Sequence, residues 1–307
     1  MTEYIYGPVP SRRLGFSLGV DLVPFKTCSY DCVYCQLGRT TNKTIERKEY
    51  FQGKDIFLQL EKALSLHQRI DYITFSGSGE PTLNSKIGAL IREIKKITKI
   101  PVAVLTNGSL FYQEKLRKEL LSADLVIPSL DAVTMKIFRK VNRPHPSLKI
   151  EEIIEGIKKF REEFEGLIWL EIMLVKGIND EKEHLDRAVS VVQEINPDKV
   201  HLNTVVRPPS EKFALPLSIG ELNKIEKLFG KNCEIIAEFK PKEQEAYSED
   251  LEEAILSIIR RRPVSLLDLS LSLGKHQNEI LKYLDPLIQD GKIKVVLYHG
   301  IKYYEIN

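Results

Sequence analysis

Residues 101–130 read PVAVLTNGSLFYQEKLRKELLSADLVIPSL and contain the pattern that decides the fold. The short apolar runs Pro101–Leu105 and Asp124–Leu130 predict strands that are buried on both faces. The amphipathic stretch Tyr112–Leu121 between them predicts a helix. Because parallel strands need a long crossover connection, this strand–helix–strand order predicts a parallel sheet covered by helices.

The same alternation of strand and helix recurs on both sides of this stretch. Further strand candidates are Leu18–Val23, Ile70–Phe75, Leu167–Val175 and Lys199–Val206. Further helix candidates are Asp55–Leu66, Lys86–Thr98, Ile150–Phe164, Glu181–Glu194 and Ile219–Phe229. Six such units predict an α/β fold with a partial (β/α)6 barrel. A doubly wound open sheet is the competing arrangement.

The composition changes after Phe239. Residues 240–248, KPKEQEAYS, have no apolar periodicity and are interpreted as a linker between a domain at 1–239 and a domain at 249–307. The last segment contains three helix candidates and two strand candidates: Leu251–Arg260, Leu266–Leu273, His276–Asp290, Lys292–Tyr298 and Ile301–Ile306. The dipeptide His299-Gly300 between the two strands is typical of a two-residue hairpin. Three helices and a hairpin predict a C-terminal winged-helix domain.

The overall composition is typical of a globular protein of 307 residues, with 43% hydrophobic and 29% charged residues. A net charge of +2 indicates no general attraction to nucleic acid or to a membrane surface. We find no signal-peptide pattern at the start and no apolar run of the length that a membrane span needs. We therefore expect a cytoplasmic protein.

Residues 27–35, TCSYDCVYC, place three of the four cysteines in the spacing Cys-x3-Cys-x2-Cys. Clustered thiols in a reducing compartment favour metal binding over disulfides, and both zinc and iron–sulfur clusters accept thiolates. A structural zinc site needs four protein ligands, but no histidine occurs before His67. Three thiolates can hold three irons of a cubane and leave the fourth iron open for a small molecule. The remaining cysteine, Cys233, is interpreted as a buried, inert thiol.

This cysteine loop resembles the signature of the radical S-adenosylmethionine (SAM) superfamily. The resemblance implies a [4Fe–4S] cluster on Cys28, Cys32 and Cys35, with SAM bound to the open iron. It also implies reductive cleavage of SAM to a 5′-deoxyadenosyl radical that abstracts hydrogen from a substrate. An electron donor such as flavodoxin or ferredoxin is then expected as a partner.

The turn after the second predicted strand resembles the Gly-Gly-Glu motif of the same superfamily. The candidate contacts to SAM in this turn are Gly77, Ser78, Gly79 and Glu80. Ser78 occupies the first glycine position of the motif, so the resemblance is better at Gly79 and Glu80. Glycine allows a close approach of backbone to ligand, and a carboxylate can pair with the amino group of SAM. A simple strand-to-helix turn is the alternative.

Polar residues follow three further predicted strands, and the resemblance implies that some of them contact SAM. These candidates are Thr106, Asn107, Ser129, Asp131 and Asn179. The alternatives are an ordinary Asn-Gly turn at Asn107 and helix N-caps at Asp131 and Asn179. The positions agree with one another, because ligands of parallel β/α folds bind at the carboxyl ends of the strands.

The block at residues 7–15, GPVPSRRLG, resembles a group of prokaryotic Fe–S oxidoreductases related to wyosine-base (tRNA) synthases. That group implies the cofactors and leaves the substrate open. Candidate substrate-binding residues are Arg12, Arg13, Arg143 and Arg207, because arginine binds phosphate and carboxylate, with a solvated rim as the alternative.

Three hypotheses for the function follow from these patterns. The first is a radical enzyme that modifies tRNA or another macromolecule, and the second is a radical enzyme that acts on a small metabolite or in cofactor maturation. The third is a regulator that bears a cluster or zinc and binds DNA through the winged helix. Residues 249–307 contain eight Lys and Arg against nine Asp and Glu, a net charge of −1, which favours protein or peptide contact over duplex binding.

Overall fold

The computed structural model describes residues 4–66, 69–236 and 251–307. Strands of the main sheet are β1 (Ile5–Ser11), β2 (Gly15–Val20), β5 (Tyr72–Phe75), β6 (Val102–Thr106), β7 (Leu125–Pro128), β8 (Leu167–Leu174), β9 (Lys199–Thr204) and β10 (Cys233–Ile235). The order in the sheet is β1-β2-β5-β6-β7-β8-β9-β10, with β1 antiparallel to β2 and the other neighbours parallel. The expectation of an α/β fold with a mostly parallel sheet is thus confirmed.

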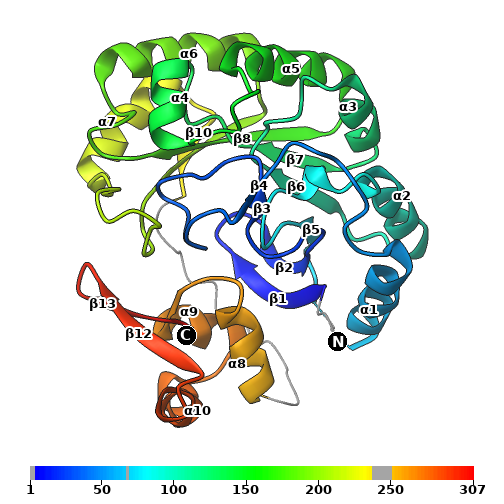
Figure 1. Ribbon diagram of the computed structural model, residues 1–307, viewed down its shortest axis with the longest axis vertical. Coiled ribbons are helices and arrows are strands. Elements are labelled where there is room, and N and C mark those ends of the chain that lie inside the picture. Colours follow the sequence, from blue (N-terminus) through cyan, green and yellow to red (C-terminus); the bar gives the residue numbers. More distant parts are fainter. Residues whose placement is uncertain (1–3, 67–68, 237–250) are drawn as a thin grey trace.

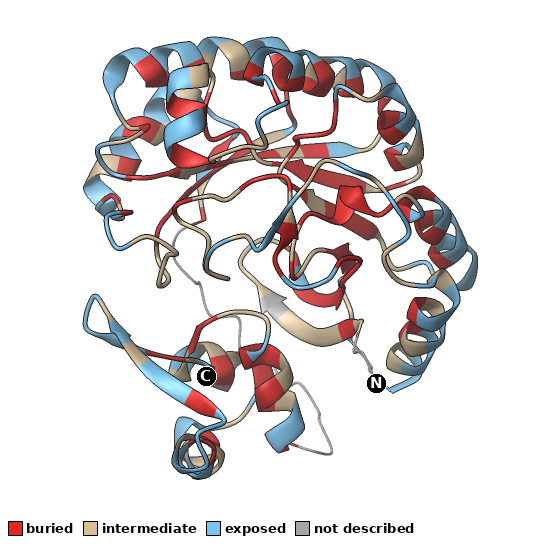
Figure 2. Cartoon of the chain, viewed as in Figure 1, coloured by how far each residue is buried: buried red, intermediate tan, exposed pale blue. Residues whose placement is uncertain are grey.

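Helices cover the outer, convex face of this curved sheet (Figure 1). They are α1 (Gly53–Leu66), α2 (Ile87–Ile97), α3 (Glu114–Leu120), α4 (Met135–Val141), α5 (Ile150–Glu163), α6 (Lys182–Ile195) and α7 (Ile219–Phe229), with a 3-10 turn at Pro81–Leu83. In α2, Ile87, Leu90, Ile91 and Ile94 are buried, which is the spacing of one helix face. Figure 2 shows the same division, with buried residues toward the sheet and exposed residues outward.

Two strands of the main sheet were not among the six predicted. Strand β1 contains glycine and proline and pairs only with β2, so it is an edge strand with little of the apolar pattern that predicts strands. Strand β10 has three residues and follows β9 at the other edge. The predicted strand at Leu18–Val23 is found at Gly15–Val20, shifted toward the N-terminus.

The C-terminal helices and hairpin form as expected and bury a separate apolar core. They are α8 (Leu251–Ile259), α9 (Leu266–Leu273), α10 (Gln277–Gln289), β12 (Ile293–Tyr298) and β13 (Ile301–Ile306), and a short strand β11 (Val264–Ser265) completes a three-stranded sheet. His299 and Gly300 both have positive φ, as a two-residue hairpin turn requires. The predicted linker at 240–248 lies outside the described residues.

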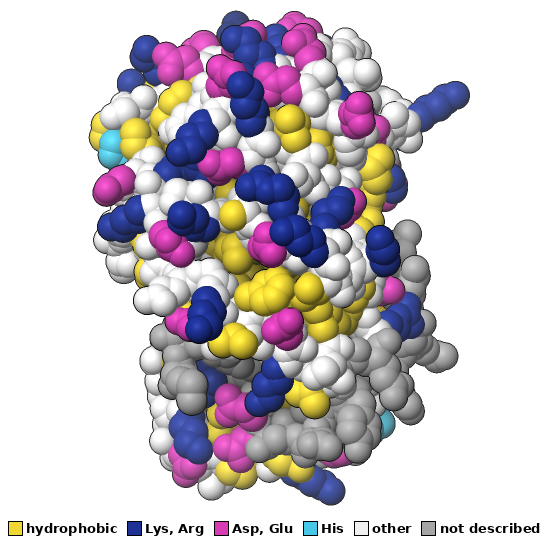
Figure 3. Space-filling model, turned by 90° about the vertical axis from the view of Figure 1, so that its right-hand side faces the viewer, with side chains coloured by type: hydrophobic (Ala, Val, Ile, Leu, Met, Phe, Trp, Pro, Cys, Tyr) yellow, Lys and Arg dark blue, Asp and Glu magenta, His cyan; other side chains and the backbone are white. Residues whose placement is uncertain are grey.

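The curved main sheet and the helices that cover it are called the barrel below. The C-terminal module packs against it, beside β1 and the end of β9 (Figure 1). The hydroxyl of Tyr298 donates to the carbonyl oxygen of Val205 at 3.2 Å, and that of Tyr303 donates to Val206 at 2.8 Å. The face drawn in Figure 3 shows Lys, Arg, Asp and Glu side chains interspersed, without a large patch of one sign. None of the helices that the structure describes is long and apolar enough to cross a membrane.

Candidate active site

The three clustered cysteines lie on the loop that follows β2, on the concave side of the sheet. They are partly exposed and line a cavity of about 400 Å³. The short strand β3 (Thr27–Cys28) begins this loop and pairs in parallel with β4 (Asn42–Lys43), which closes it. Inside the loop the amide of Cys35 donates to the carbonyl of Cys32 at 3.1 Å. These backbone bonds hold the thiols toward the cavity.

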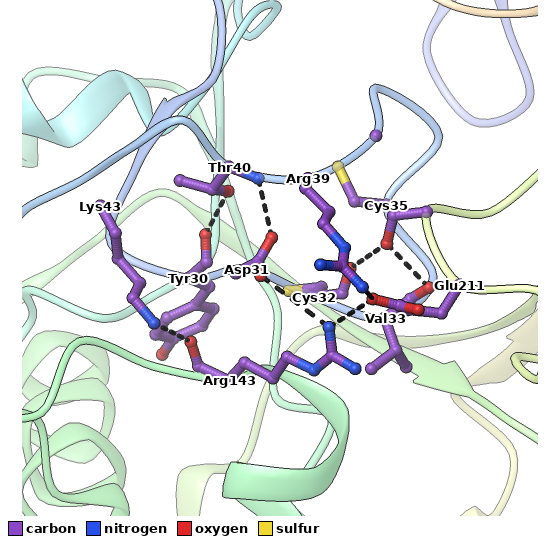
Figure 4. A network of polar contacts seen from close by, with 12 residues as sticks. Tyr30, Asp31, Cys32, Val33, Cys35, Arg39, Thr40, Lys43, Arg143 and Glu211 are labelled. Atoms are coloured by element: carbon purple, nitrogen blue, oxygen red, sulfur yellow. Dashed lines mark hydrogen bonds and ion pairs between the residues drawn. The ribbon is translucent and has the colours of Figure 1, made fainter.

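Polar contacts on the outer side of the loop fix its position (Figure 4). Thr40 donates its hydroxyl to the carbonyl of Tyr30 at 2.6 Å and its amide to Asp31 at 2.7 Å. Arg143 pairs with Glu211 at 2.6 Å and lies 3.9 Å from Asp31. Arg143 is not among the residues that line the cavity, so its guanidinium holds the cysteine loop and is not placed for the predicted contact with substrate.

Each thiol of the loop has a hydrogen-bond donor beside it. Asn107 Nδ2 lies 3.5 Å from the sulfur of Cys28, Asn142 Nδ2 lies 3.4 Å from that of Cys32, and Lys26 Nζ lies 3.3 Å from that of Cys35. Donors directed at sulfur stabilise thiolates and adjust the reduction potential of iron–sulfur clusters.

Without a bound metal, the surroundings of two of the thiols favour their protonated form. Burial, reinforced by the charge of Glu80, raises the pKa of Cys28 to about 12, and burial with the charge of Asp131 raises the pKa of Cys32 well above its usual value. Such thiols become thiolates when a metal binds. No three His, Cys, Asp or Glu side chains in the described part of the chain converge on a single ion. A cubane does not need such convergence, because each thiolate binds a different iron. The three thiols therefore fit a [4Fe–4S] cluster.

Glu80 lies on the turn after β5 and lines the same cavity. Its carboxylate accepts hydrogen bonds from the hydroxyls of Thr82 and Thr106, both at 2.6 Å, and from the amide of Asn107 at 2.7 Å. Burial raises the pKa of Glu80, and these donors oppose the increase. The result is a buried carboxylate that is held in one orientation beside the cysteine loop.

The glycines of this turn are required by the protein's own packing. A Cβ atom at Gly79 would overlap the carbonyl oxygen of Thr27, next to the first cysteine. Gly77 has φ of +136°, and a Cβ there would approach the carboxylate of Asp21. Ser78 donates its amide to Asp21 at 3.2 Å, and its hydroxyl is also bonded to Asp21. All three residues line the cavity, but the polar groups of Ser78 are already used within the protein.

Thr106, Asn107 and Ser129, at the ends of β6 and β7, also line the cavity. Asp131 and Asn179 do not, although they follow β7 and β8. The Asp131 carboxylate accepts from Met173 N at 2.9 Å and from Asn142 at 2.6 Å, and the Tyr34 hydroxyl also donates to it.

The side chain of Asn179 is used in the same way. It donates to the carbonyls of Asp131 and Met173, both at 2.8 Å, and accepts from Val175 at 2.7 Å. Asp131 and Asn179 thus make contacts that join neighbouring strand ends. The interpretation of the two residues as helix caps is wrong, because Thr134 caps α4 and Glu181 is the N-cap position of α6.

Arg12 and Arg13 precede β2, and both line the cavity together with Arg207. Arg13 pairs with Glu171 at 2.6 Å, and Glu171 accepts from Asn203 at 2.9 Å. Asn203 in turn accepts from Arg12 at 3.1 Å, and Arg12 also donates to the carbonyl of Ile236, after β10, at 2.8 Å. This chain of contacts joins the two edges of the open barrel through its interior.

Several cavity residues were not predicted as site residues, among them Lys26, Glu171, Asn203, Arg261 and Arg262. Glu171 had a sequence signal, since it is the one charged residue in the apolar run of β8. The arginines of the C-terminal module had none, because only the packing of the module brings them to the barrel.

Comparison with known proteins agrees with this geometry. A family model described as the radical SAM superfamily matches residues 22–188. The UPF0026 protein MJ1312 of Methanocaldococcus jannaschii is 39% identical over 309 residues, covering 98% of this chain and 95% of the relative. A protein of Brachyspira hyodysenteriae named GTPase Obg is 40% identical over all of this chain, which spans 45% of that relative's length.

A solved structure shares the fold. The crystal structure of a radical SAM methyltransferase from Sphaerobacter thermophilus superposes with a TM-score of 0.56 at 17% identity, over 71% of this chain and 65% of the other. At this identity the similarity concerns the fold alone. The matched family model, the near full-length relative and the barrel architecture lead to one conclusion: this chain belongs to the radical SAM superfamily of enzymes, together with the UPF0026 proteins.

Proposed function

We propose that the chain binds a [4Fe–4S] cluster through Cys28, Cys32 and Cys35, binds SAM beside it, and abstracts hydrogen from a substrate in the same cavity. The observation that carries the proposal is that three thiols, each beside a hydrogen-bond donor, and the oriented carboxylate of Glu80 line one cavity. When bound, the reduced cluster supplies one electron that cleaves SAM to methionine and a 5′-deoxyadenosyl radical.

The residues of the chain have separate tasks in this proposal. Glu80 accepts hydrogen bonds from the amino group of SAM. The hydrogen bonds that Glu80 accepts from Thr82, Thr106 and Asn107 keep its carboxylate in position before SAM binds. Ser129, which follows β7, contacts the ribose or the carboxylate of SAM in this proposal. Asn107, Asn142 and Lys26 donate toward the sulfur atoms of the three cysteines that would hold the cluster.

We further propose that residues 1–239 and 249–307 are two domains, a radical SAM partial barrel and a winged helix. Support comes from the separate core of the C-terminal helices and hairpin. Ile258, Arg261 and Arg262 of this module line the cavity, which favours a role for the module in holding the substrate. Its net negative charge favours a protein or peptide partner over tRNA. A cytoplasmic flavodoxin or ferredoxin is proposed as the electron donor.

Anaerobic reconstitution tests the proposal. We expect about four irons per chain and formation of 5′-deoxyadenosine that depends on a reductant. Cys32→Ala should lose both properties, whereas Cys233→Ala, which changes the buried cysteine of β10, should retain both. Zinc binding without SAM cleavage, or iron retained equally in both variants, would contradict the assignment.

A further inference from the structure

Two arginines from distant parts of the chain line the same cavity, and a carboxylate pairs with one of them. Arg207 follows β9 of the barrel, Arg262 lies between α8 and β11 of the module, and both line the cavity. Asp268 lies 3.5 Å from Arg207. The carboxylate of Asp268 is already used as a cap of α9, where it accepts from the amide of Ser265 at 3.0 Å. Arg207 is thus paired with a carboxylate that is also committed to a helix terminus.

The hydrogen-bonding capacity of these arginines is largely unused within the described residues. The side chain of Arg207 is 10% exposed, and its buried Nε has no hydrogen-bond partner among those residues. A buried polar group normally has a partner, so the described residues leave the guanidinium of Arg207, a residue that lines the cavity, incompletely satisfied. Within the described part of the chain, Asp268 is the one carboxylate in ion-pair contact with Arg207, and no ion pair of Arg262 is found.

The charges also act on one another. The charge of Arg207, followed by burial, lowers the pKa of Arg262 to about 10. Burial, followed by the charge of Arg207, lowers the pKa of Arg12 to about 9. Both arginines nevertheless remain charged at neutral pH, so like charges are held together beside the cavity. An anion bound between them would relieve this repulsion.

We propose that Arg207 and Arg262, with Arg12 beside them, bind the phosphate group of a small phosphomonoester substrate. A carboxylate has two oxygens, which a single guanidinium can satisfy, whereas a phosphate presents three terminal oxygens to guanidinium groups from different directions. This assignment rests on the proposed function, since it concerns the substrate that meets the radical. It adds the substrate class and a residue of the C-terminal module to that function.

The position of the module favours a small phosphomonoester over a nucleic acid. Arg262 reaches the cavity because the module is fastened to the barrel at Val205 and Val206 by the hydroxyls of Tyr298 and Tyr303. Arg261, next to Arg262, pairs with Asp21 at the end of β2. The cavity that these contacts bring Arg262 to has a volume of about 400 Å³, which is the size of a site for a small molecule. The phosphodiester of a nucleic acid also carries one negative charge, and a phosphomonoester carries up to two.

Calorimetric titration of inorganic phosphate into the anaerobically reconstituted, SAM-saturated protein tests the proposal. We expect phosphate to bind more tightly than acetate. Arg207→Gln and Arg262→Gln should each weaken phosphate binding about 10- to 100-fold, the effect of removing a charge-assisted hydrogen bond. The control Arg260→Gln changes an exposed neighbour that pairs with Glu253, and it should leave the affinity within twofold. Arg207→Lys keeps the positive charge and loses the bidentate geometry of the guanidinium, so its affinity for phosphate should be intermediate. This variant tests the site even if Arg207→Gln does not fold.

The outcomes separate this inference from the proposed function. If 5′-deoxyadenosine forms but millimolar phosphate does not bind, the phosphate site is wrong and the radical enzyme stands. If phosphate displaces SAM, the arginines bind the carboxylate of SAM and the inference is overturned. If an RNA oligonucleotide without terminal phosphate binds more tightly through the same arginines, the phosphomonoester assignment is overturned. Failure to bind iron would contradict the proposed function, and phosphate binding can still be measured on the iron-free chain.

Discussion

The contact between Arg261 and Asp21 predicts that Arg261→Gln destabilises the barrel, although Arg261 belongs to the C-terminal module. Asp21 lies at the end of β2 and is 5% exposed, and its partner Arg261 is 15% exposed. Ser78 donates both its amide and its hydroxyl to the same carboxylate. Arg261 also lies over the ring of Tyr6, 4.9 Å from its centroid. The substitution removes the countercharge and leaves the two bonds from Ser78.

The expected loss follows from the burial of this pair. Removal of one partner of a buried ion pair costs about 3–5 kcal/mol, because a buried charge remains uncompensated. The two bonds from Ser78 and protonation of Asp21 limit the loss, so we expect about 3 kcal/mol at pH 7. For a domain of the size of the barrel this corresponds to a decrease in Tm of about 6–12 °C.

The loss should depend on pH in one direction. Burial raises the pKa of Asp21 above its usual value, and Ser78 and Arg261 oppose that increase. A carboxyl group with a raised pKa in the folded state favours folding at low pH, and that contribution disappears as the pH rises through the folded pKa. Without Arg261 the pKa of Asp21 rises further, so the difference between variant and wild type should be larger at pH 7.5 than at pH 5.

Urea unfolding followed by tryptophan fluorescence measures this effect in the barrel. Trp169, the single tryptophan of the chain, lies in β8, so its emission reports the barrel and not the module. Arg260→Gln is the matched control, and Asp21→Asn in the Arg261→Gln background should recover part of the lost stability. Equal stability of the Arg261 and Arg260 variants, or a deficit that increases as the pH falls, would refute this explanation.

Three further predictions test the site and the attachment of the module. Gly79→Ala should lower the free energy of unfolding by about 2–3 kcal/mol and lower the iron content after reconstitution, because its Cβ would displace the cysteine loop. The control Gly220→Ala, with open space around it, should be neutral or slightly stabilising in the same unfolding measurements. Glu80→Gln should weaken SAM affinity at least about tenfold in equilibrium binding and retain the iron content, because the amide has the shape of the carboxylate without its charge. Unchanged affinity would show that Glu80 does not belong to the SAM site. Tyr303→Phe should cost about 1 kcal/mol and increase amide exchange in β13, because the bond to Val206 is lost, and unaltered exchange would show that this bond does not hold the module.

Six of the parallel strands, β2 and β5 to β9, were predictable because their signal is local. Strands covered on both faces consist of continuous apolar residues, and the intervening helices carry an apolar stripe. The edge strands β1 and β10 lack such a signal, since an edge strand tolerates glycine and proline and can be very short. The cysteine spacing likewise indicates metal chemistry without any knowledge of the fold, because the ligand types and their number lie within nine residues.

The direction of each polar side chain at the strand ends was not predictable from position alone. Ser129 and Asp131 follow the same strand, yet Ser129 lines the cavity and Asp131 is enclosed by Tyr34, Asn142 and Met173. Arg143 was expected at the cavity and lies behind the cysteine loop. These outcomes depend on partners supplied by other strands and loops.

The sequence by itself determined the class of the fold and the three thiols on one loop, because both depend on residues that are near each other in the chain. The tertiary structure alone decided which groups share the cavity with those thiols. Arg261 and Asp21 are 240 residues apart, and Arg207 meets Asp268 only because the module packs against the end of β9. Such contacts arise when apolar faces of distant elements are buried together, and no local pattern of residues encodes them.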